Sequence, residues 1–450
     1  MSVYPKNLSN FLNRMSGYNK NNIKMNVLGT NTANQSDIVQ VELPSNSIVD
    51  LSSLAWAFDL AFAAPGAGGD AHYPVNAESI INRLAVEVNG QTLVNITNYN
   101  VLYHTLLYMT ATEDFQRQRL VAQANTGNSV ASGTSQEVAA NGGATAPRRH
   151  VIDTWLGFLG SSKPAFIDTS LLGNVRITIT LASGEIINGV TAGAAAAPTR
   201  EYALSNMHFS VDVVTIADGI YDAMVDQMLA SGAPIEVPFK NYFSYQTLQQ
   251  SMTQTTPFNV ASQSIDRLWA VARPQDYNAA NLAGSGRVAT APQHDLVENN
   301  SRFFNFQTCN GGNFQFQINN TMYPQWASDA PQDWFQHTKL AVGDQGNMLS
   351  GSFPTSLKQY VDNFFVYACQ LEHRTDSSER FVSGIDTRGA AAQCYFKSTQ
   401  TAQANDLDIG AAGGANINRA GAAVANQITV FAECTSLLRI SANKVLEVVQ

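Results

Sequence analysis

The second half of this chain repeats the order of structural signals found in its first half. In the first half, an alternating apolar and polar strand runs into Asn89-Gly90, and a short strand and a helical stretch follow. In the second half, a similar strand runs into Asn319-Asn320, and again a short strand and a helical stretch follow. Asparagine and glycine accept the positive φ angles that a tight hairpin turn requires. We therefore predict two similar β units in tandem, which indicates a building block rather than a catalyst.

The length of the chain favours two domains rather than one. At 450 residues it exceeds the size at which a single hydrophobic core stops growing. The repeated signals divide it into an N-terminal arm at 1–36, a first β unit at 37–217 and a second β unit at 218–450. The second unit is predicted to open with a connecting helix at 218–232, because an aspartate cap precedes an apolar stripe and a glycine ends it.

Both units are predicted to consist of short strands separated by turns or loops. Alternation of apolar and polar residues, or a short apolar run, predicts strands within residues 39–43, 48–62, 81–96, 151–159, 175–181, 202–216, 235–237, 265–271, 314–318, 364–371 and 428–449. Helical patterns follow the two hairpins at 99–122 and 333–342. Segments rich in small or polar residues predict loops at 63–74, 123–150, 189–199, 274–300 and 401–427. Many short strands with turn signals between them are typical of an all-β sandwich.

The charge balance argues against broad nucleic-acid binding. The chain carries a formal net charge of −9, whereas such binding usually needs a basic face. Charged residues make up 14% of the chain, against about 25% in a typical protein, so neutral polar side chains supply much of the surface. A surface of this kind suits contacts with other proteins, because burying charge at an interface is costly. No sequence-specific contact with nucleic acid is predicted.

The segment 1–36 has a local excess of positive charge. It holds no acidic residue and four basic residues, namely Lys6, Arg14, Lys20 and Lys24. Four apolar residues share one face of a predicted short helix, namely Leu8, Phe11, Leu12 and Met15. A basic amphipathic helix can lie on an anionic membrane surface. It can equally dock on a partner protein or on its own β unit, and the sequence leaves these three roles open.

The cysteine pattern indicates reduced core residues. None of Cys309, Cys369, Cys394 and Cys434 forms the Cys-x-x-Cys pair of a zinc ribbon or redox site. The last three lie in apolar strand-like runs, where a free thiol behaves as a small hydrophobe. This pattern fits assembly in a reducing cytosol. No secretory signal and no apolar run of about 20 residues is visible in the sequence.

No catalytic, metal-binding or cofactor-binding motif stands out. The sequence has no Gly-x-Ser-x-Gly elbow and no Walker loop, and its seven histidines lack metal-ligand spacing. A structural Ca²⁺ in an aspartate-bearing loop is left open. Trp56, Trp155 and Trp269 lie on strand-like stretches and are predicted core residues, whereas Trp326 and Trp334 flank a loop and a helix. We assign no catalytic, metal-binding or cofactor-binding residue and predict that the protein is not an enzyme.

The ordered set of segments resembles a known family. The segments that carry the resemblance are residues 81–94 with the helix after them, 171–181, 314–324 and 438–449. Together they resemble the double jelly-roll major capsid proteins of tailless double-stranded DNA phages, adenovirus-like viruses, virophages, polinton-like viruses and large nucleocytoplasmic DNA viruses. The resemblance covers the chain from about residue 37 to its end.

The resemblance implies a fold and an assembly. The implied fold is all-β, with two tandem eight-stranded jelly-roll sandwiches and short helices in the connecting loops. Three chains would form a pseudo-hexameric homotrimeric capsomer that tiles an icosahedral shell in the virion, with no cofactor and no catalytic residue. The implied partners are neighbouring trimers, penton and minor capsid proteins, and an internal membrane reached through the arm. Synthesis in the host cytoplasm or a viral factory is expected.

Two other classes of protein share such sandwiches. A glycan-processing enzyme with paired jelly rolls would need a carboxylate pair or a triad in a cleft between the units, and the sequence nominates none. A carbohydrate-binding or receptor-binding sandwich would expect glycan-facing aromatic residues in its loops. A closed shell or a hexagonal array under the electron microscope separates the capsid protein from both alternatives.

Overall fold

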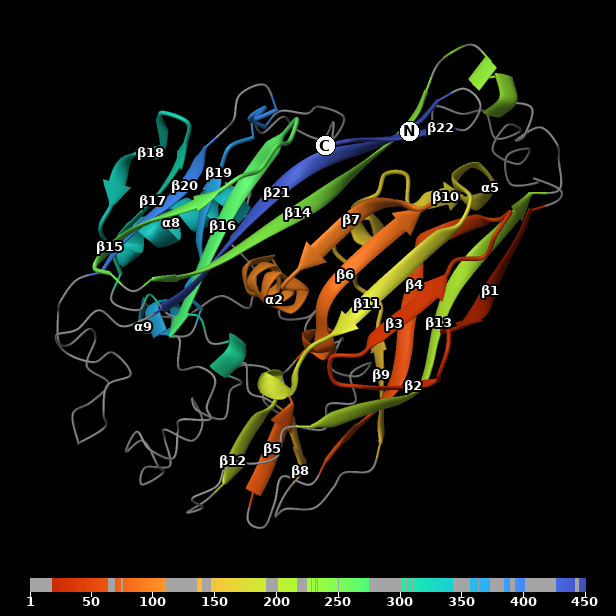
Figure 1. Ribbon diagram of the computed structural model, residues 1–450, viewed down its shortest axis with the longest axis horizontal. Helices are drawn as coiled ribbons and strands as arrows, with labels where there is room; N and C mark the ends of the chain where they lie inside the picture. Colours follow the sequence, from red (N-terminus) through yellow and green to blue (C-terminus); the bar gives the residue numbers. More distant parts are fainter. Residues whose placement is uncertain are drawn as a thin grey trace, which may run out of the picture.

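The computed structural model describes most of the chain as strands and short helices (Figure 1). The residues that it describes are 18–63, 69–73, 76–110, 136–139, 147–191, 201–216, 225–227, 229–230, 232, 234–249, 251–274, 302–304, 306, 308, 311–342, 357–362, 364–372, 384–388, 393–400, 426–441 and 445–450.

The first sandwich contains two antiparallel sheets. The larger sheet has, in order, β1 (Tyr18–Asn26), β13 (Tyr202–Ile216), β4 (Ile48–Phe62) and β10 (Phe166–Asp168), with β2 (Thr32–Asn34) beside β13 and β9 (Arg148–Ile152) beside β4. The smaller sheet has, in order, β3 (Ile38–Glu42), β11 (Val175–Leu181), β6 (Ile81–Val88) and β7 (Gln91–Thr97).

The second sandwich is built in the same way. Its larger sheet has, in order, β14 (Ile235–Gln249), β21 (Asn426–Ser441), β16 (Ile265–Pro274) and β19 (Tyr367–Gln370), with β22 (Val445–Val449) beside β21. Its smaller sheet has, in order, β15 (Thr253–Phe258), β20 (Cys394–Gln400), β17 (Gly311–Ile318) and β18 (Thr321–Ser328).

The two sandwiches share one strand order, so each strand of the first has a counterpart in the second. The eight counterpart pairs are β1 and β14, β3 and β15, β4 and β16, β6 and β17, β7 and β18, β10 and β19, β11 and β20, and β13 and β21. The prediction of two tandem eight-stranded sandwiches is confirmed, with β2, β9 and β22 as additional strands.

Short helices occupy several connections between strands. They are η1 (Ala77–Ile80), α2 (Tyr99–Thr110), α4 (Phe158–Ser161), α5 (Thr169–Leu172), η2 (Gly184–Ile186), η5 (Arg302–Phe304), α8 (Pro331–Val342) and α9 (Leu357–Asp362). The helices predicted after the two hairpins correspond to α2 and α8, although residues 111–122 lie outside the described residues. In the predicted connecting helix, residues 225–227 and 229–230 are helical and Gly232 has a φ of 78°, and its other residues are not described. Among the described helices, none has the length and apolar character to span a bilayer.

Three predicted loops contribute a small third sheet. β12 (Asn188–Thr191), β5 (Gly69–Tyr73) and β8 (Gln136–Ala139) pair in that order, and Figure 1 shows them beyond one end of the first sandwich. The loop predictions at 63–74, 123–150 and 189–199 are therefore wrong for these strands. These three strands form a sheet outside the sandwich and have no large core to face. Their glycine- and alanine-rich sequences therefore show no alternation of apolar and polar residues from which a strand could be predicted. Most of the predicted loops at 274–300 and 401–427 lies outside the described residues.

The predicted arm contains the first strand of the first sandwich. β1 pairs along its whole length with β13, from Tyr18 opposite Ile216 to Asn26 opposite His208. The boundary predicted at residue 37 is therefore wrong, and the sandwich begins within the segment assigned to the arm. The alternation that marks a strand is missing because residues 19–24 are exposed on both faces of this edge strand.

Alternating apolar residues build the core of the first sandwich. Trp56 and Phe58 of β4 and Phe209 of β13 are fully buried, and the rings of Trp56 and Phe209 stack with centroids 5.6 Å apart. Burying one large apolar side chain stabilises a fold by about 1.5–3 kcal/mol. The predicted strand at 151–159 is wrong after Ile152, since Gly157 has a φ of 73° and α4 follows it.

The two predicted hairpins are present. Asn89 and Gly90 have φ angles of 47° and 82° between β6 and β7, as a two-residue turn of this type requires. Asn319 has a φ of 54° in the turn from β17 to β18, and Asn320 is its second residue. Both turns therefore set the register of the strands that they join.

Replacing Gly90 with Val should lower the free energy of unfolding by about 1–2 kcal/mol, because a β-branched residue resists the left-handed backbone. A β-carbon at Gly90 would meet no atom within 4 Å, so the cost is conformational and not steric. Gly90→Asn is the matched control, since asparagine adopts this conformation more readily. Urea denaturation of the two variants measures the difference, and equal stabilities would contradict the assignment.

Candidate assembly site

The two sandwiches meet where β7 of the first approaches β14 of the second (Figure 1), and α4 of the first also contacts β14. The ring of Phe158 on α4 meets the ring of Phe239 on β14 edge to face, with centroids 5.3 Å apart. Both side chains are buried. Edge-to-face aromatic pairs contribute about 0.5–1.5 kcal/mol beyond the area that they bury. This contact forms the apolar part of the joint, which is the interface between the two sandwiches.

Hydrogen bonds fix the joint on both sides of this aromatic pair. The backbone N–H of Lys240 donates to Ser161 Oγ at 2.8 Å, and the backbone N–H of Lys163 donates to the carbonyl of Pro238 at 3.0 Å. The hydroxyls of Thr97 on β7 and Ser244 on β14 lie 2.5 Å apart. The edge of β14 is therefore covered by the first sandwich, and an uncovered strand edge is prone to aggregation.

A second contact joins the sandwiches through α2. His104 on α2 stacks on Phe304 of η5, with ring centroids 3.7 Å apart. His104 is itself fixed by Ser79, whose Oγ lies 2.8 Å from His104 Nε2. Two separate contacts restrain rotation of one sandwich against the other more than either contact alone would.

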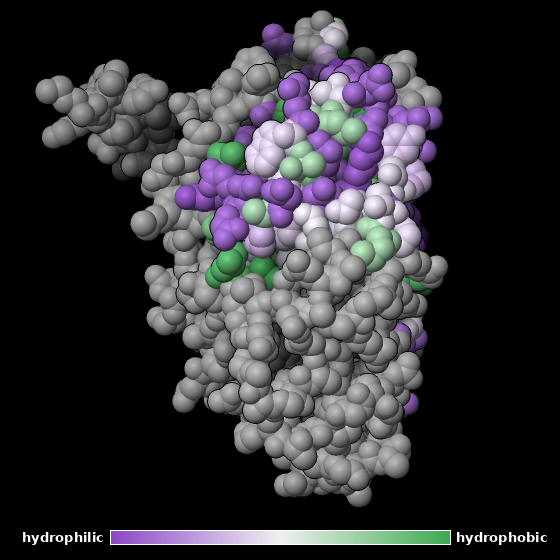
Figure 2. Space-filling view, turned by 90° about the vertical axis from the view of Figure 1, so that its left-hand side faces the viewer, coloured by the Kyte–Doolittle hydropathy of each residue, from purple (hydrophilic) through white to green (hydrophobic). Residues whose placement is uncertain are grey.

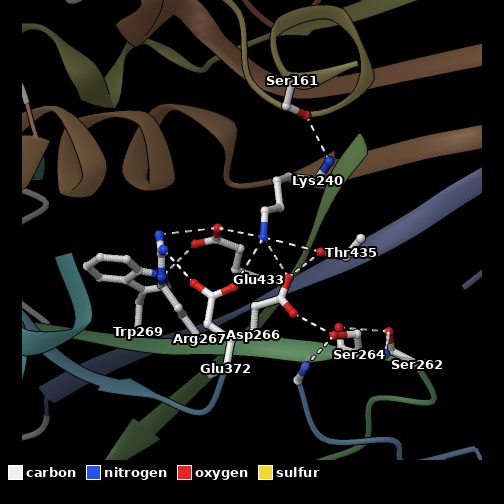
Figure 3. Close-up of polar contacts among 11 residues, drawn as sticks. Ser161, Lys240, Ser262, Ser264, Asp266, Arg267, Trp269, Glu372, Glu433 and Thr435 are labelled. Carbon is white, nitrogen blue, oxygen red and sulfur yellow. Dashed lines mark hydrogen bonds and ion pairs between the residues drawn. The ribbon is translucent and has the colours of Figure 1, made fainter. Parts of the chain in front are cut away.

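Behind the joint, Lys240 points into a cluster of carboxylates (Figure 3). Its Nζ lies 2.7 Å from Asp266 Oδ2, 3.7 Å from Glu372 Oε2 and 3.8 Å from Glu433 Oε1. The side chains of Asp266 and Glu433 are only 2% and 4% exposed. Burial opposes the charge of Lys240, but the nearby carboxylates of Glu433 and Asp266 outweigh it and raise the lysine pKa.

A second cation completes this cluster. Arg267 Nη2 lies 2.5 Å from Glu372 Oε1, and its Nη1 lies 3.6 Å from Glu433 Oε1. Trp269 Nε1 donates to the other oxygen of Glu433 at 3.2 Å. Burial likewise opposes the charge of Arg267, and the carboxylates of Glu433 and Glu372 raise its pKa despite it. Two cations thus face three carboxylates.

Two hydroxyls also donate hydrogen bonds to the carboxylate of Asp266. Thr435 Oγ1 donates to Oδ2 at 2.6 Å, and Ser264 Oγ donates to Oδ1 at 2.6 Å. Ser264 Oγ in turn accepts the backbone N–H of Gly384 at 2.9 Å. A buried carboxylate with several donors is held in one geometry, which suits a structural role better than proton transfer.

The first sandwich has a smaller version of this cluster on its counterpart strands. Lys20 Nζ on β1 lies 2.9 Å from Asp212 Oδ2 on β13 and 3.2 Å from Asp50 Oδ2 on β4. Asn22 also donates to Asp212 at 2.7 Å. Lys20 on β1 therefore reaches past β13 to Asp50 on β4, and Lys240 on β14 reaches past β21 to Asp266 on β16. In both sheets the aspartate lies at a register shift between the two strands that follow the lysine strand.

Comparisons of sequence find no family model and no curated protein that matches the chain. Comparison of structures finds solved proteins that match over nearly the whole chain. PBCV-1 VP54, fitted into a reconstruction of the virophage Sputnik, has a TM-score of 0.63 at 12% identity and covers 100% of this chain and 99% of its own. The quasi-atomic model of the PBCV-1 virus capsid has a TM-score of 0.63 at 13% identity and covers 99% and 98%. The Faustovirus major capsid protein has a TM-score of 0.55 at 10% identity and covers 97% and 92%.

The chain has a double jelly-roll fold. The shared strand order and the full-length structural match decide this, and identities this low bear on fold alone. Each of the two sandwiches is therefore a jelly roll.

The predicted site residues fall into three groups. Those outside the described residues are Lys6, Leu8, Phe11, Leu12, Arg14 and Met15. Lys20 and Lys24 lie on β1 and not on an arm. The hairpin residues Asn89, Gly90, Asn319 and Asn320 lie at the two turns predicted for them. The residues of the ionic cluster are not among those predicted from the sequence.

The tryptophans mostly fill the jelly-roll cores, as predicted. Trp56, Trp155 and Trp269 are buried, and Trp155 Nε1 donates to the carbonyl of Leu54 at 2.8 Å. Trp334 is also buried, whereas Trp326 on β18 is 53% exposed. Within the described ranges, no cluster of three or more His, Cys, Asp or Glu side chains is arranged to hold a metal ion.

The described cysteines are free thiols held in the second jelly roll. Burial raises the pKa of Cys369 and of Cys434 to about 12 each and also raises the pKa of Cys394. At pH 8 the first two should carry about 1000-fold less thiolate than an ordinary exposed cysteine. We expect iodoacetamide to modify them slowly in the folded protein and quickly in urea, as measured by mass spectrometry of each peptide. Rapid modification without urea would contradict the buried placement.

Proposed function

We propose that this chain is a major capsid protein whose copies assemble as a homotrimer. In such a trimer six jelly rolls surround one axis, so that a threefold assembly fills a nearly hexagonal tile. The single observation that carries this proposal is the repetition of one strand order in two jelly rolls fixed together by the joint. The solved proteins with the same fold include a virus capsid and a major capsid protein, which supports the assignment.

A shell requires a stiff subunit, and the fold meets this demand. The subunit must be stiff, and the joint restrains the two jelly rolls through ring contacts and hydrogen bonds. Contacts between tiles need not be strong, because a closed lattice makes many of them at once. The cations of the cluster are paired with carboxylates of the same subunit, so they need no partner from a neighbouring subunit.

The same proposal extends to location and partners. The protein would lie in the virion shell, after synthesis in the host cytoplasm or a viral factory. Neighbouring trimers, penton and minor capsid proteins are the proposed partners, and no enzymatic activity or cofactor is proposed. The arm is limited to the residues before β1, and its proposed partner is an internal membrane or a minor capsid protein.

Solution mass and electron microscopy test the capsid proposal. We expect light scattering to give a molar mass near three times 48.6 kDa. We also expect negative-stain images to show hexagonal tiles, arrays or closed shells. Monomers that form none of these across a broad range of salt and pH would overturn the proposal.

Two truncations separate the arm from the first jelly roll. Deleting residues 1–17 should leave the melting temperature and the trimer unchanged, because β1 stays in place. It should reduce co-sedimentation with anionic vesicles if the arm binds membranes. Deleting residues 1–27 also removes β1 with the pairs of Lys20, so it should lower the melting temperature. Equal stability of the two truncated proteins would contradict the assignment of β1 to the jelly roll.

A further inference from the structure

The joint uses one strand from each jelly roll, and each chain holds a counterpart of both strands that lies outside the joint. Inside the chain, β7 of the first jelly roll lies beside β14 of the second. The counterpart of β7 is β18, and the counterpart of β14 is β1. Figure 1 shows β18 and β1 at opposite ends of the molecule. A head-to-tail repeat of the joint would therefore bring β18 of one copy to β1 of the next.

The two lysines align β1 with β14 residue by residue. Lys20 and Lys240 make the same cross-strand contact to an aspartate, and an asparagine follows each of them. Counting from the lysines, Lys24 takes the position of Ser244, which contacts β7 in the joint. Ile23 takes the position of the residue before Ser244.

The aligned strands differ in how far they are covered. On β14, Phe239 and Tyr242 are buried, and the first jelly roll packs on this strand. On β1, the aligned residues Asn19 and Asn22 are exposed, and the apolar Ile23 is 39% exposed. A single copy thus leaves on β1 the surface that the joint covers on β14.

β18 presents a neutral surface with an exposed aromatic ring. Trp326 is 53% exposed, and its neighbours Gln325 and Ala327 are exposed as well. The strand carries no charged residue, and the exposed Asp329 follows it directly. Figure 2 shows the side of the molecule on which β18 lies, where pale and green residues are interspersed with purple hydrophilic ones.

The ends of β7 and β18 also correspond. Each strand follows a hairpin turn and runs to the start of a helix, α2 or α8. Thr97 ends β7 and meets Ser244 in the joint, so the segment from Trp326 to Asp329 is its equivalent. In a repeat of the joint, this segment would meet Ile23 and Lys24 of the next copy.

We propose that β18 of one copy packs on β1 of the next, with Trp326 against Ile23 and Asp329 beside Lys24. This inference rests on the proposed trimer and names the surfaces that close it. Exposed tryptophans are enriched among the residues that dominate protein interfaces. The carboxylate of Asp329 and the ammonium of Lys24 have opposite charge, which favours this register over others. After three copies, each β18 and each β1 is covered.

A designed cross-link tests the contact directly. In the Ile23→Cys, Trp326→Cys double variant, mild oxidation should give covalent dimers and trimers and no larger product. The matched control is Phe166→Cys with Trp326→Cys. Phe166 is 49% exposed on β10, at the opposite edge of the sheet from β1. The control should stay monomeric on a denaturing gel, and cross-linking equal to that of the test variant would overturn the proposal.

Charge variants supply a second readout. Ile23→Arg with Trp326→Arg should convert the trimer to monomer by light scattering, while circular dichroism stays unchanged. Phe166→Arg should remain trimeric. Lys24→Glu and Asp329→Lys should each weaken the trimer, and the combined exchange should restore it at least in part.

The outcomes separate the two proposals. If the unmodified protein is monomeric and forms no tiles, the capsid proposal and this contact both fail. If it is trimeric but the test pair does not cross-link and the arginine variant remains trimeric, the contact alone is wrong. A trimer with the expected cross-link supports both.

Discussion

Replacing Lys240 with Met is expected to lower the free energy of unfolding by about 3–5 kcal/mol, with the lower end favoured because the lysine side chain is 31% exposed. The substitution removes the cation that pairs with Asp266 and leaves in the cluster only Arg267, which pairs with Glu372 and Glu433. Asp266 and Glu433 are almost fully buried and cannot regain the water that they lose on folding. Urea denaturation followed by tryptophan fluorescence measures the loss.

The matched control is Arg439→Met on β21. Arg439 Nη2 pairs with Glu236 at 2.9 Å, but the two side chains are 35% and 44% exposed. Exposed pairs contribute about 0–1 kcal/mol, so the control should change stability little. Equal losses in the two variants would contradict the structural importance of the buried cluster.

The pH dependence gives an independent check on Lys240. Its pKa in the folded protein is raised above the ordinary value of 10.5. The stabilisation that it supplies is therefore complete below pH 10.5 and is lost as the pH rises through the folded pKa. The difference in stability between the natural protein and Lys240→Met should shrink in this alkaline range. A constant difference would mean that the charge of Lys240 does not stabilise the fold.

Replacing Phe158 with Ala is expected to cost about 3–5 kcal/mol and to weaken the joint. Phe158 is fully buried and meets Phe239 edge to face, so the substitution leaves a cavity between the two jelly rolls. We expect calorimetry to resolve two unfolding transitions for the variant. The natural protein should unfold more cooperatively. Cooperativity between domains depends on the interface that they share.

Phe166→Ala is the control for this experiment. It removes the same atoms from a ring that is 49% exposed on β10. We expect a small change in stability and an unchanged pattern of transitions, since surface substitutions rarely exceed about 0.5 kcal/mol. Splitting of the transitions by Phe166→Ala as well would show that the joint is not the element that couples the jelly rolls.

Strands with one buried face could be predicted closely from the sequence. The bounds predicted for β4, β11 and β13 match the structure, because each strand presents alternating residues to a core. The hairpin at Asn89 and Gly90 was equally predictable, because few residues accept its backbone angles. The edge strand β1 could not be predicted, because its exposed asparagines and lysines give no alternation of apolar and polar residues.

The ionic cluster could not be predicted from local pattern. Its members come from β14, β16, β21 and the segment after β19, which are brought together only by the strand order. One signal was present in the sequence. Asp266 and Glu433 are acidic residues inside predicted strands rich in apolar residues, and a buried carboxylate requires a partner. The Lys-Asn pairs that begin at Lys20 and Lys240 were a second signal. The distance between them in the sequence did not show that the two lysines lie on counterpart strands.

The covalent link between the jelly rolls sets a hierarchy of affinities. The contact of β7 with β14 forms within one polypeptide, at a local concentration that dilution cannot change. The contact proposed between β18 and β1 joins separate molecules, so its occupancy falls when the protein is diluted. A ring held in this way would dissociate into whole chains and never into single jelly rolls, which keeps the two kinds of jelly roll in strict one-to-one ratio and alternating order around every tile.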